Sequence, residues 1–120
     1  MNLSSSGSMR GWAPLLGAAA ALVVSACGGP ATPATVPARY EGPLAERADA
    51  AKGEAIYQRY CDSCHPGGRE DVGPALAGRK LSPGKVRWFV REGGDAMPAF
   101  PADKVSDEDL EHLAAYVGSL

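Results

Sequence analysis

The sequence predicts an all-α protein with three main helices and connecting loops. Three segments place apolar residues at intervals of three and four, and each follows a residue type that commonly caps a helix. No segment alternates apolar and polar residues as a half-buried strand does. The helices are expected to run from Asp49 towards Tyr60, from Ser82 to the Gly93-Gly94 pair, and from Ser106 or Asp107 to Leu120.

Each expected helix has its own start signal. Asp49 can cap the first helix, and Gly53, Ile56, Tyr57 and Tyr60 share one side of it. Ser82 offers a hydroxyl cap to the middle helix, followed by a proline at the first helical position. Three acidic residues at the start of the last helix complement its positive end. The apolar stripes are Val86, Phe89 and Val90 in the middle helix, and Leu110, Leu113, Tyr116, Val117 and Leu120 in the last.

Composition divides the chain into three parts. Residues 1–27 contain Arg10 and then an uncharged run rich in Leu, Ala and Val, which is the layout of a secretory signal. The end of this run resembles the lipobox of bacterial lipoproteins, so Cys27 is expected to carry a lipid and to begin the mature protein. A signal peptide cut elsewhere and an uncleaved anchor are the alternatives. Residues 28–48, rich in Pro, Ala and Gly, are predicted to be a tether, and residues 49–120 one small domain.

The segment Cys61-Asp62-Ser63-Cys64-His65 predicts a covalent attachment site for one c-type haem. Two thiols three positions apart can each form a thioether with one vinyl group of the porphyrin, and the adjoining imidazole can ligate the iron. A bound haem would also supply an apolar centre to a domain that is short for a hydrophobic core alone.

A Cys-x-x-Cys pair has two other uses, which remain open at this point. A redox dithiol of the thioredoxin type expects a βαβ pattern, whereas the residues before Cys61 have helical spacing. A structural zinc site needs four ligands, and besides Cys27 the chain offers only Cys61, Cys64, His65 and the distant His112. The haem interpretation alone uses the histidine that directly follows the second cysteine.

The arrangement resembles a class I cytochrome c over about all of residues 49–120. That family places a glycine and an aromatic residue eight and four positions before the first haem cysteine, where this chain has Gly53 and Tyr57. The resemblance implies that the first and last helices cross closely, with Tyr116 of the last helix lying against the backbone. It also implies the small cytochrome c fold and one-electron transfer.

The same resemblance implies a set of groups around the iron. His65 would be the proximal ligand, and Met97 lies in a segment that resembles the family's methionine loop and would be the second axial ligand. His112 is the rival ligand, but its acidic neighbours in the last helix predict a solvent-facing side chain. The Pro74 carbonyl would accept the imidazole N–H of His65, and Leu76 would pack on the haem.

Charged residues gather in two clusters, which predicts a dipolar domain. The basic cluster lies in and before the middle helix, and the acidic cluster lies at the last helix. We expect the basic side to guide an acidic redox partner towards the haem edge; a solvated helix face without a partner is the alternative. The clusters are Arg79, Lys80, Lys85, Arg87 and Arg91, and Asp103, Asp107, Glu108, Asp109 and Glu111.

Together these features predict a lipid-anchored, extracytoplasmic cytochrome that passes one electron at a time between membrane-associated respiratory proteins. The alternatives are a cytochrome c subunit of a fixed dehydrogenase or oxidase complex and, if Met97 ligation is labile, a haem enzyme or gas sensor. We expect a monomer without catalytic residues of its own, on the periplasmic side if the organism is Gram-negative. Nucleic-acid binding is not expected, because basic residues are few and the formal net charge is −2.

Overall fold

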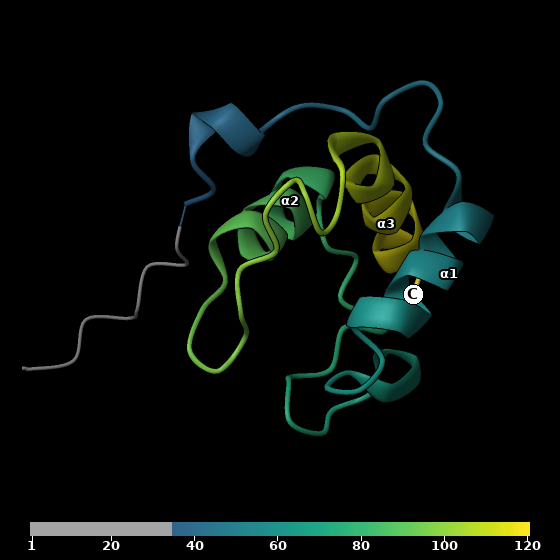
Figure 1. Ribbon diagram of the computed structural model, residues 1–120, viewed down its shortest axis with the longest axis vertical. Coiled ribbons are helices and arrows are strands. Elements are labelled where there is room, and N and C mark those ends of the chain that lie inside the picture. Colours follow the sequence, from purple (N-terminus) through teal and green to yellow (C-terminus); the bar gives the residue numbers. More distant parts are fainter. Residues whose placement is uncertain (1–34) are drawn as a thin grey trace, which may run out of the picture. The chain divides into compact units, whose positions relative to one another are not determined.

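The computed structural model describes residues 35–120, whose secondary structure is helical (Figure 1). The predicted all-α class is confirmed, and the one strand-like pairing in this part of the chain is an isolated bridge between Gly94 and Met97. None of the helices formed by these residues is long and apolar enough to cross a membrane. The predicted signal segment, Cys27 and the first part of the tether lie outside the described residues. The elements are η1 (Ala38–Tyr40), α1 (Ala50–Tyr60), η2 (Pro66–Gly68), α2 (Pro83–Glu92) and α3 (Asp107–Ser119).

The three α-helices begin at the predicted caps. The side chains of Asp49, Ser82 and Ser106 each accept a hydrogen bond from a backbone N–H in the first turn of the helix that follows. α2 ends at Gly93, whose φ of 71° is a conformation that favours glycine. Local sequence therefore determines where these helices start and where α2 stops.

α1 and α3 make the most extensive contact between helices, and a glycine permits their close approach. A Cβ atom on Gly53 would lie 2.0 Å from the backbone oxygen of His112 and 2.8 Å from the Cβ of Tyr116. No larger residue fits there without moving one helix. Tyr57, one turn further along α1, is 1% exposed, and its ring meets that of Tyr116 edge-on with centroids 5.2 Å apart. The predicted close crossing is confirmed.

The buried apolar core is drawn from all three α-helices and from the segment before α3. Each large aliphatic or aromatic side chain that is fully buried contributes about 1.5–3 kcal/mol. Phe89 departs from the predicted stripe of α2, since it is 37% exposed while Val86 and Val90 are buried. The core consists of Tyr57, Val86, Val90, Val105, Leu110, Leu113, Ala114 and Val117.

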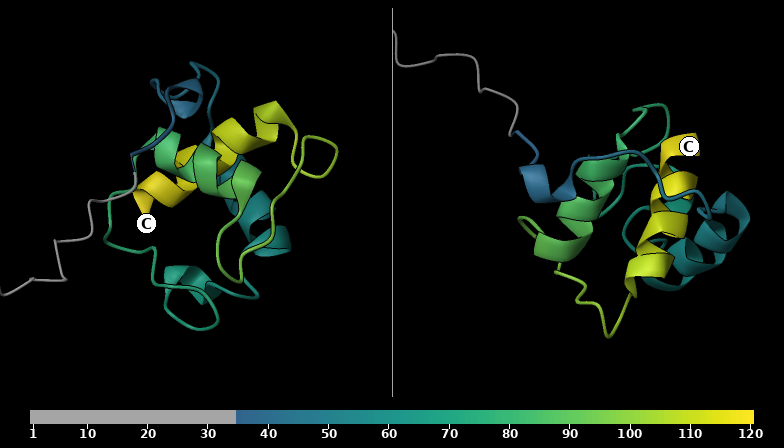
Figure 2. Two further views of the ribbon diagram at one scale, coloured as in Figure 1. Left: turned by 90° about the vertical axis from the view of Figure 1, so that its left-hand side faces the viewer. Right: turned by 90° about the horizontal axis from the view of Figure 1, so that it is seen from above.

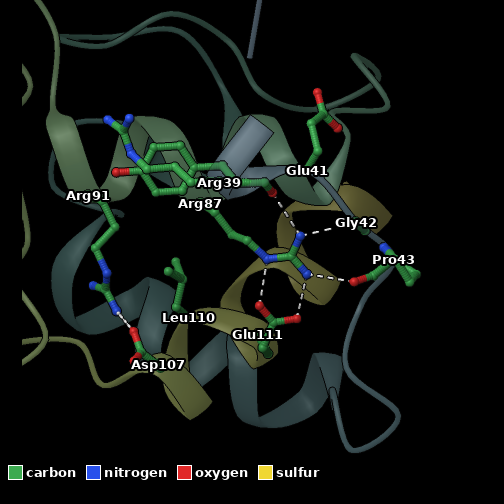
Figure 3. Close-up of a pocket in the computed structure, with 10 residues that line it drawn as sticks. Arg39, Glu41, Gly42, Pro43, Arg87, Arg91, Asp107, Leu110 and Glu111 are labelled. Atoms are coloured by element: carbon green, nitrogen blue, oxygen red, sulfur yellow. Dashed lines mark hydrogen bonds and ion pairs between the residues drawn. The ribbon is translucent and has the colours of Figure 1, made fainter. Parts of the chain in front are cut away.

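Residues 38–48, which we call the strap, are attached to α2 and α3 (Figures 2 and 3). The guanidinium of Arg87 donates hydrogen bonds to the backbone oxygens of Tyr40, Gly42 and Pro43 at 2.8–3.1 Å. It also pairs with both carboxylate oxygens of Glu111 at 2.6 and 2.7 Å. The composition of these residues predicted a tether, because they include few large apolar side chains. In the structure, hydrogen bonds to the strap backbone hold it against α2 and α3.

The predicted separation into a basic and an acidic pole is wrong for four side chains. Arg87 pairs with Glu111, and Arg91 pairs with Asp107 at 2.7 Å. Because α2 packs against α3, the basic residues of one helix meet the acidic residues of the other. Both arginines therefore belong to the fold rather than to a docking surface. The members of the basic cluster without an ion pair to the described residues are Arg79, Lys80 and Lys85.

The prediction that His112 faces solvent is also wrong, because its side chain is buried at 3% exposure. Its Nδ1 accepts a hydrogen bond from the backbone N–H of Asp49 at 2.9 Å, and its Nε2 lies 3.8 Å from a carboxylate oxygen of Glu108. The acidic neighbours in the sequence suggested a solvated face. In the structure, the end of the strap and the start of α1 cover the His112 side chain.

Replacing Glu111 with glutamine should lower the free energy of unfolding at pH 7 and make that free energy depend less on pH in the acid range. Arg87 lowers the pKa of Glu111 below its ordinary value of 4.5, chiefly through its hydrogen bond to the carboxylate. The folded state therefore binds a proton at Glu111 less readily than the unfolded chain does. This contribution to stability is complete above about pH 4.5 and is lost as pH falls through the folded pKa. For Glu111→Gln we expect a loss of about 1–2 kcal/mol in unfolding free energy at pH 7, measured by urea denaturation, and a smaller loss at pH 3.

Glu70→Gln is the matched control, because Glu70 is exposed and makes no hydrogen bond or ion pair with the described residues. An equal loss in the two variants at pH 7 would contradict the role of Glu111. So would a loss in Glu111→Gln that is the same at pH 3 as at pH 7.

Candidate functional site

The Cys-x-x-Cys-His motif forms a tight turn directly after α1. The backbone N–H groups of Cys64 and His65 both donate to the carbonyl of Cys61, at 3.1 and 2.9 Å. Both cysteines are half-buried, and Cys61 packs against the core. His65 is buried at 6% exposure. The turn thus carries the two thiols and the imidazole beside the apolar centre of the domain.

The His65 ring is held by the segment that the sequence singled out. Its Nδ1 lies 2.8 Å from the carbonyl oxygen of Pro74, as the resemblance implied. Since a carbonyl only accepts, the neutral ring carries its proton on Nδ1 and keeps the Nε2 lone pair for a metal. Gly73 donates its N–H to the Cys64 carbonyl at 2.9 Å, and a Cβ atom at Gly73 would lie 2.1 Å from the ring. The glycine makes room for the imidazole.

The surroundings of the two cysteines do not suit the other uses of such a pair. Burial raises the pKa of the Cys61 thiol to about 11, whereas a redox dithiol works with a lowered thiol pKa. Among residues 35–120, no three His, Cys, Asp or Glu side chains gather where they could hold a metal ion, as a zinc site requires.

Met97 lies on a short loop between α2 and α3. The backbone groups of Gly94 and Met97 bond to each other in both directions, at 2.8 and 3.0 Å. A Cβ atom at Gly93 would lie 2.6 Å from the Met97 carbonyl oxygen, so a glycine is needed where the loop folds back. The Met97 side chain is half-buried and packs against the core.

The far end of this loop is fastened by Arg91, a role that sequence reasoning missed. The guanidinium donates to the backbone oxygens of Phe100 and Val105 at 2.8 and 2.9 Å. Phe100 also donates its N–H to the Val90 carbonyl at 2.7 Å, and its ring meets the ring of Tyr60 edge-on. No local signal marks this role, because Arg91 appears in the sequence as one basic residue on the polar side of a helix.

The Cys-x-x-Cys-His turn and the loop that carries Met97 lie towards the same end of the domain. Figure 1 and the left-hand view of Figure 2 place η2 and the loop after α2 at the lower side. Cys61, Leu76 and Met97 all pack against one core cluster. Two thiols, an imidazole with Nε2 available and a half-buried thioether beside apolar side chains are the groups that a His/Met-ligated c-type haem requires. The residues present fit that cofactor.

Comparison with known proteins identifies the family. Residues 48–117 match the family described as cytochrome C oxidase, cbb3-type, subunit III. The chain belongs to this cytochrome c family. The cytochrome is 44% identical over 68 residues to the cytochrome c subunit of 4-cresol dehydrogenase (hydroxylating) from Pseudomonas putida. This match covers 57% of the chain and spans 59% of the length of that subunit.

A second curated relative and a solved structure agree with this assignment. The cytochrome is 36% identical over 84 residues to cytochrome c6 from Synechocystis, a match that covers 63% of this chain and 69% of that protein. A crystal structure of p-cresol methylhydroxylase with substrate bound contains a chain of similar fold, with 45% identity and a TM-score of 0.51. The similarity covers 57% of this chain and 90% of that chain.

The family determines the cofactor and the broad class of function. The cytochrome carries one covalently bound haem c, with Cys61 and Cys64 spaced for its attachment. It is an electron-transfer protein rather than a catalytic enzyme, and it interacts with redox partners. Cytochromes c of this kind are extracytoplasmic.

Gly73→Ala should displace the His65 imidazole. The added Cβ would overlap the His65 ring and break its hydrogen bond to the Pro74 carbonyl. Overpacking of this kind costs about 1–3 kcal/mol. We expect a loss of unfolding free energy in that range, together with an altered absorption spectrum of the haem-loaded protein.

Gly118→Ala is the matched control. Gly118 is exposed in α3, and the nearest atom to its added Cβ would be the backbone oxygen of Leu81 at an ordinary 3.5 Å. This control should keep the wild-type spectrum and lose no stability, because alanine is the better helix former. A wild-type spectrum in Gly73→Ala would show that the ring does not depend on the space at residue 73.

Proposed function

We propose that this cytochrome is a one-electron carrier that passes electrons between membrane-associated respiratory proteins outside the cytoplasm. The observation that carries the proposal is the orientation of His65. Its Nδ1 is bound to the Pro74 carbonyl, which leaves Nε2 as the ligand atom. A hydrogen bond of this kind fixes a ligand ring and increases its basicity.

The residues of the site would divide the work of holding the haem. Cys61 and Cys64 would form the two thioether bonds, and His65 and Met97 would be the axial ligands of the iron. Leu76, which packs against the core, would lie on the haem. When bound, the haem supplies exchange of one electron between Fe(III) and Fe(II). A neutral thioether ligand favours the reduced iron, and two protein ligands leave no axial position for oxygen or peroxide.

The loop that carries Met97 is suited to a ligand that stays in place. Gly94 binds it at one end, and the hydrogen bonds of Arg91 and Phe100 fasten it at the other. A ligand held by its own backbone needs little rearrangement when the iron changes charge. This supports a carrier over a haem enzyme or gas sensor, which would need an open position at the iron.

A second candidate function is that of a cytochrome c subunit in a fixed dehydrogenase or oxidase complex. The 44% identity to the cytochrome c subunit of 4-cresol dehydrogenase favours it. The two candidates differ in how long the cytochrome stays with its partner. Purification from the membrane at high salt separates them, because a fixed subunit would elute with an enzyme in stoichiometric amount and a carrier would elute alone as a monomer.

Lipid attachment at Cys27 is the proposed means of membrane association. Three features of the sequence support it: the basic start, the apolar run and the small residues before the cysteine. The strap is attached to α2 and α3, so the chain available as a free tether would end near Ala38. A lipid-held domain of this kind would reach its partners without diffusing away from the membrane.

Absorption spectra of the full-length cytochrome test the proposed ligands. We expect a c-type reduced spectrum, a methionine-to-Fe(III) charge-transfer band in the oxidised state and no response of the reduced state to carbon monoxide. Met97→Ala should abolish the band and admit carbon monoxide, because it opens one axial position. Val72→Ala is the control, since Val72 is 69% exposed. Ready carbon monoxide binding by the wild type, without the band, would favour the enzyme or sensor alternative.

Mass spectrometry of the detergent-solubilised protein tests the anchor. The expected mature chain begins at Cys27 and carries the added mass of a lipid, in addition to one haem. Cys27→Ala should lack the lipid mass, whereas Ser63→Ala, a change inside the haem motif, should retain it. A wild-type chain that begins elsewhere and carries no lipid would exclude this mode of anchoring.

A further inference from the structure

The hydroxyl of Tyr57 is the only polar side-chain atom among the residues of the buried core described above. It donates a hydrogen bond to the backbone oxygen of His65 and accepts one from the backbone N–H of Gly68 at 3.0 Å. A side chain of α1 thus reaches the backbone of the proposed proximal ligand. Packing of an aromatic ring does not by itself require this contact.

Gly68 extends the contact into a small network. Its N–H also lies 2.9 Å from the His65 oxygen, so it is shared between that oxygen and the Tyr57 hydroxyl. Its carbonyl accepts from the N–H groups of Leu76 and Ala77 at 2.8 and 3.0 Å. Residues 65–77 form a loop whose two ends are joined by these hydrogen bonds at Gly68. The Tyr57 hydroxyl therefore contacts the loop at the point where its ends meet.

The position of the hydroxyl is set by the crossing of α1 and α3. The Tyr57 ring is 1% exposed and lies edge-on to the ring of Tyr116. Burial raises the pKa of Tyr57 to about 12, so the hydroxyl is neutral and donates at physiological pH. The ring is held by the core, and the hydroxyl is held by the loop.

We propose that Tyr57 is a positioning residue for His65, with its hydroxyl holding the His65 backbone against α1 and so keeping the imidazole in line with the Pro74 carbonyl. The inference rests on the proposed role of His65 as an iron ligand. Without the hydroxyl, the His65 backbone is released from α1 and the hydrogen bond from Nδ1 to Pro74 weakens. The imidazole becomes less basic, Fe(III) is stabilised less, and the reduction potential rises.

Tyr57→Phe probes this role because it leaves no buried partner unsatisfied. The His65 oxygen and the Gly68 N–H remain bonded to each other when the hydroxyl is gone. The ring and its contact with Tyr116 are kept. A change in redox behaviour then reports the position of the ligand rather than a collapse of the core.

The experiment compares full-length Tyr57→Phe and Tyr116→Phe, each with its haem attached. Tyr116 is the matched control, because it is the other ring of the same pair and its hydroxyl makes no hydrogen bond to the described residues. In Tyr57→Phe we expect a higher reduction potential and about tenfold faster hydrogen exchange at the N–H groups of Gly73 and Leu76. Tyr116→Phe should change neither quantity.

Wild-type values in Tyr57→Phe would overturn the inference. An equal change in both variants would overturn it as well, since that would assign the effect to aromatic packing. If Tyr57→Phe yields no protein with attached haem, nuclear magnetic resonance of the wild type decides. A slowly exchanging Tyr57 hydroxyl proton supports the inference, and exchange as fast as in a solvent-exposed tyrosine overturns it.

Failure of the proposed function would be seen in a different measurement. If the wild-type cytochrome itself lacks the methionine charge-transfer band, that result counts against His/Met ligation. The comparison of amide exchange between the two variants does not depend on that ligation. It therefore tests the hold of Tyr57 on the loop separately.

Discussion

The close crossing of α1 and α3 at Gly53 is the constraint on which the rest of the structure depends. The backbone of His112 lies where a side chain at residue 53 would be, so the two helices approach more closely than side chains would allow. The crossing buries the ring of Tyr57 and places its hydroxyl at the His65 carbonyl. On the other side, the His112 ring accepts the N–H of Asp49 at the start of α1. One interhelical distance thus fixes both ends of α1.

The site is held mainly by hydrogen bonds to the backbone. His65 is bonded through its ring to Pro74 and through its carbonyl to Tyr57, and the loop of Met97 is bonded through Phe100 to α2 and Arg91. A small domain has little apolar mass with which to immobilise two loops. Hydrogen bonds from buried or half-buried side chains supply the rigidity, which suits a protein that exchanges electrons with little movement of its ligands.

Charge in this cytochrome is used largely within the domain. Arg87 and Glu111 are both mostly buried, and such a pair requires that its remaining hydrogen-bonding groups be satisfied. Three carbonyl oxygens of the strap satisfy the guanidinium. The same arginine therefore joins α2, α3 and the strap. A partner that docks by electrostatic attraction would meet the basic residues outside these pairs, such as Lys85.

The sequence by itself determined the features that depend on near neighbours along the chain. Caps at Asp49, Ser82 and Ser106, the stop at Gly93 and the haem motif all act within a few residues. The contact of His65 with Pro74, which spans nine positions, was implied by the resemblance to class I cytochromes c. Chemistry of this kind is legible in order and spacing, because the backbone brings such residues together in only a few ways.

Only the tertiary structure decided the roles of residues that meet across helices. Arg87 and Glu111 are 24 positions apart, and Asp49 and His112 are 63 apart. The polarity of Arg87, Glu111 and His112 predicted exposure, because a charged or polar residue on a helix is most often solvated. Whether it finds a partner instead depends on the angle and distance at which helices pack. Those are set by the whole core and by one glycine, not by the residue's own neighbours in the chain.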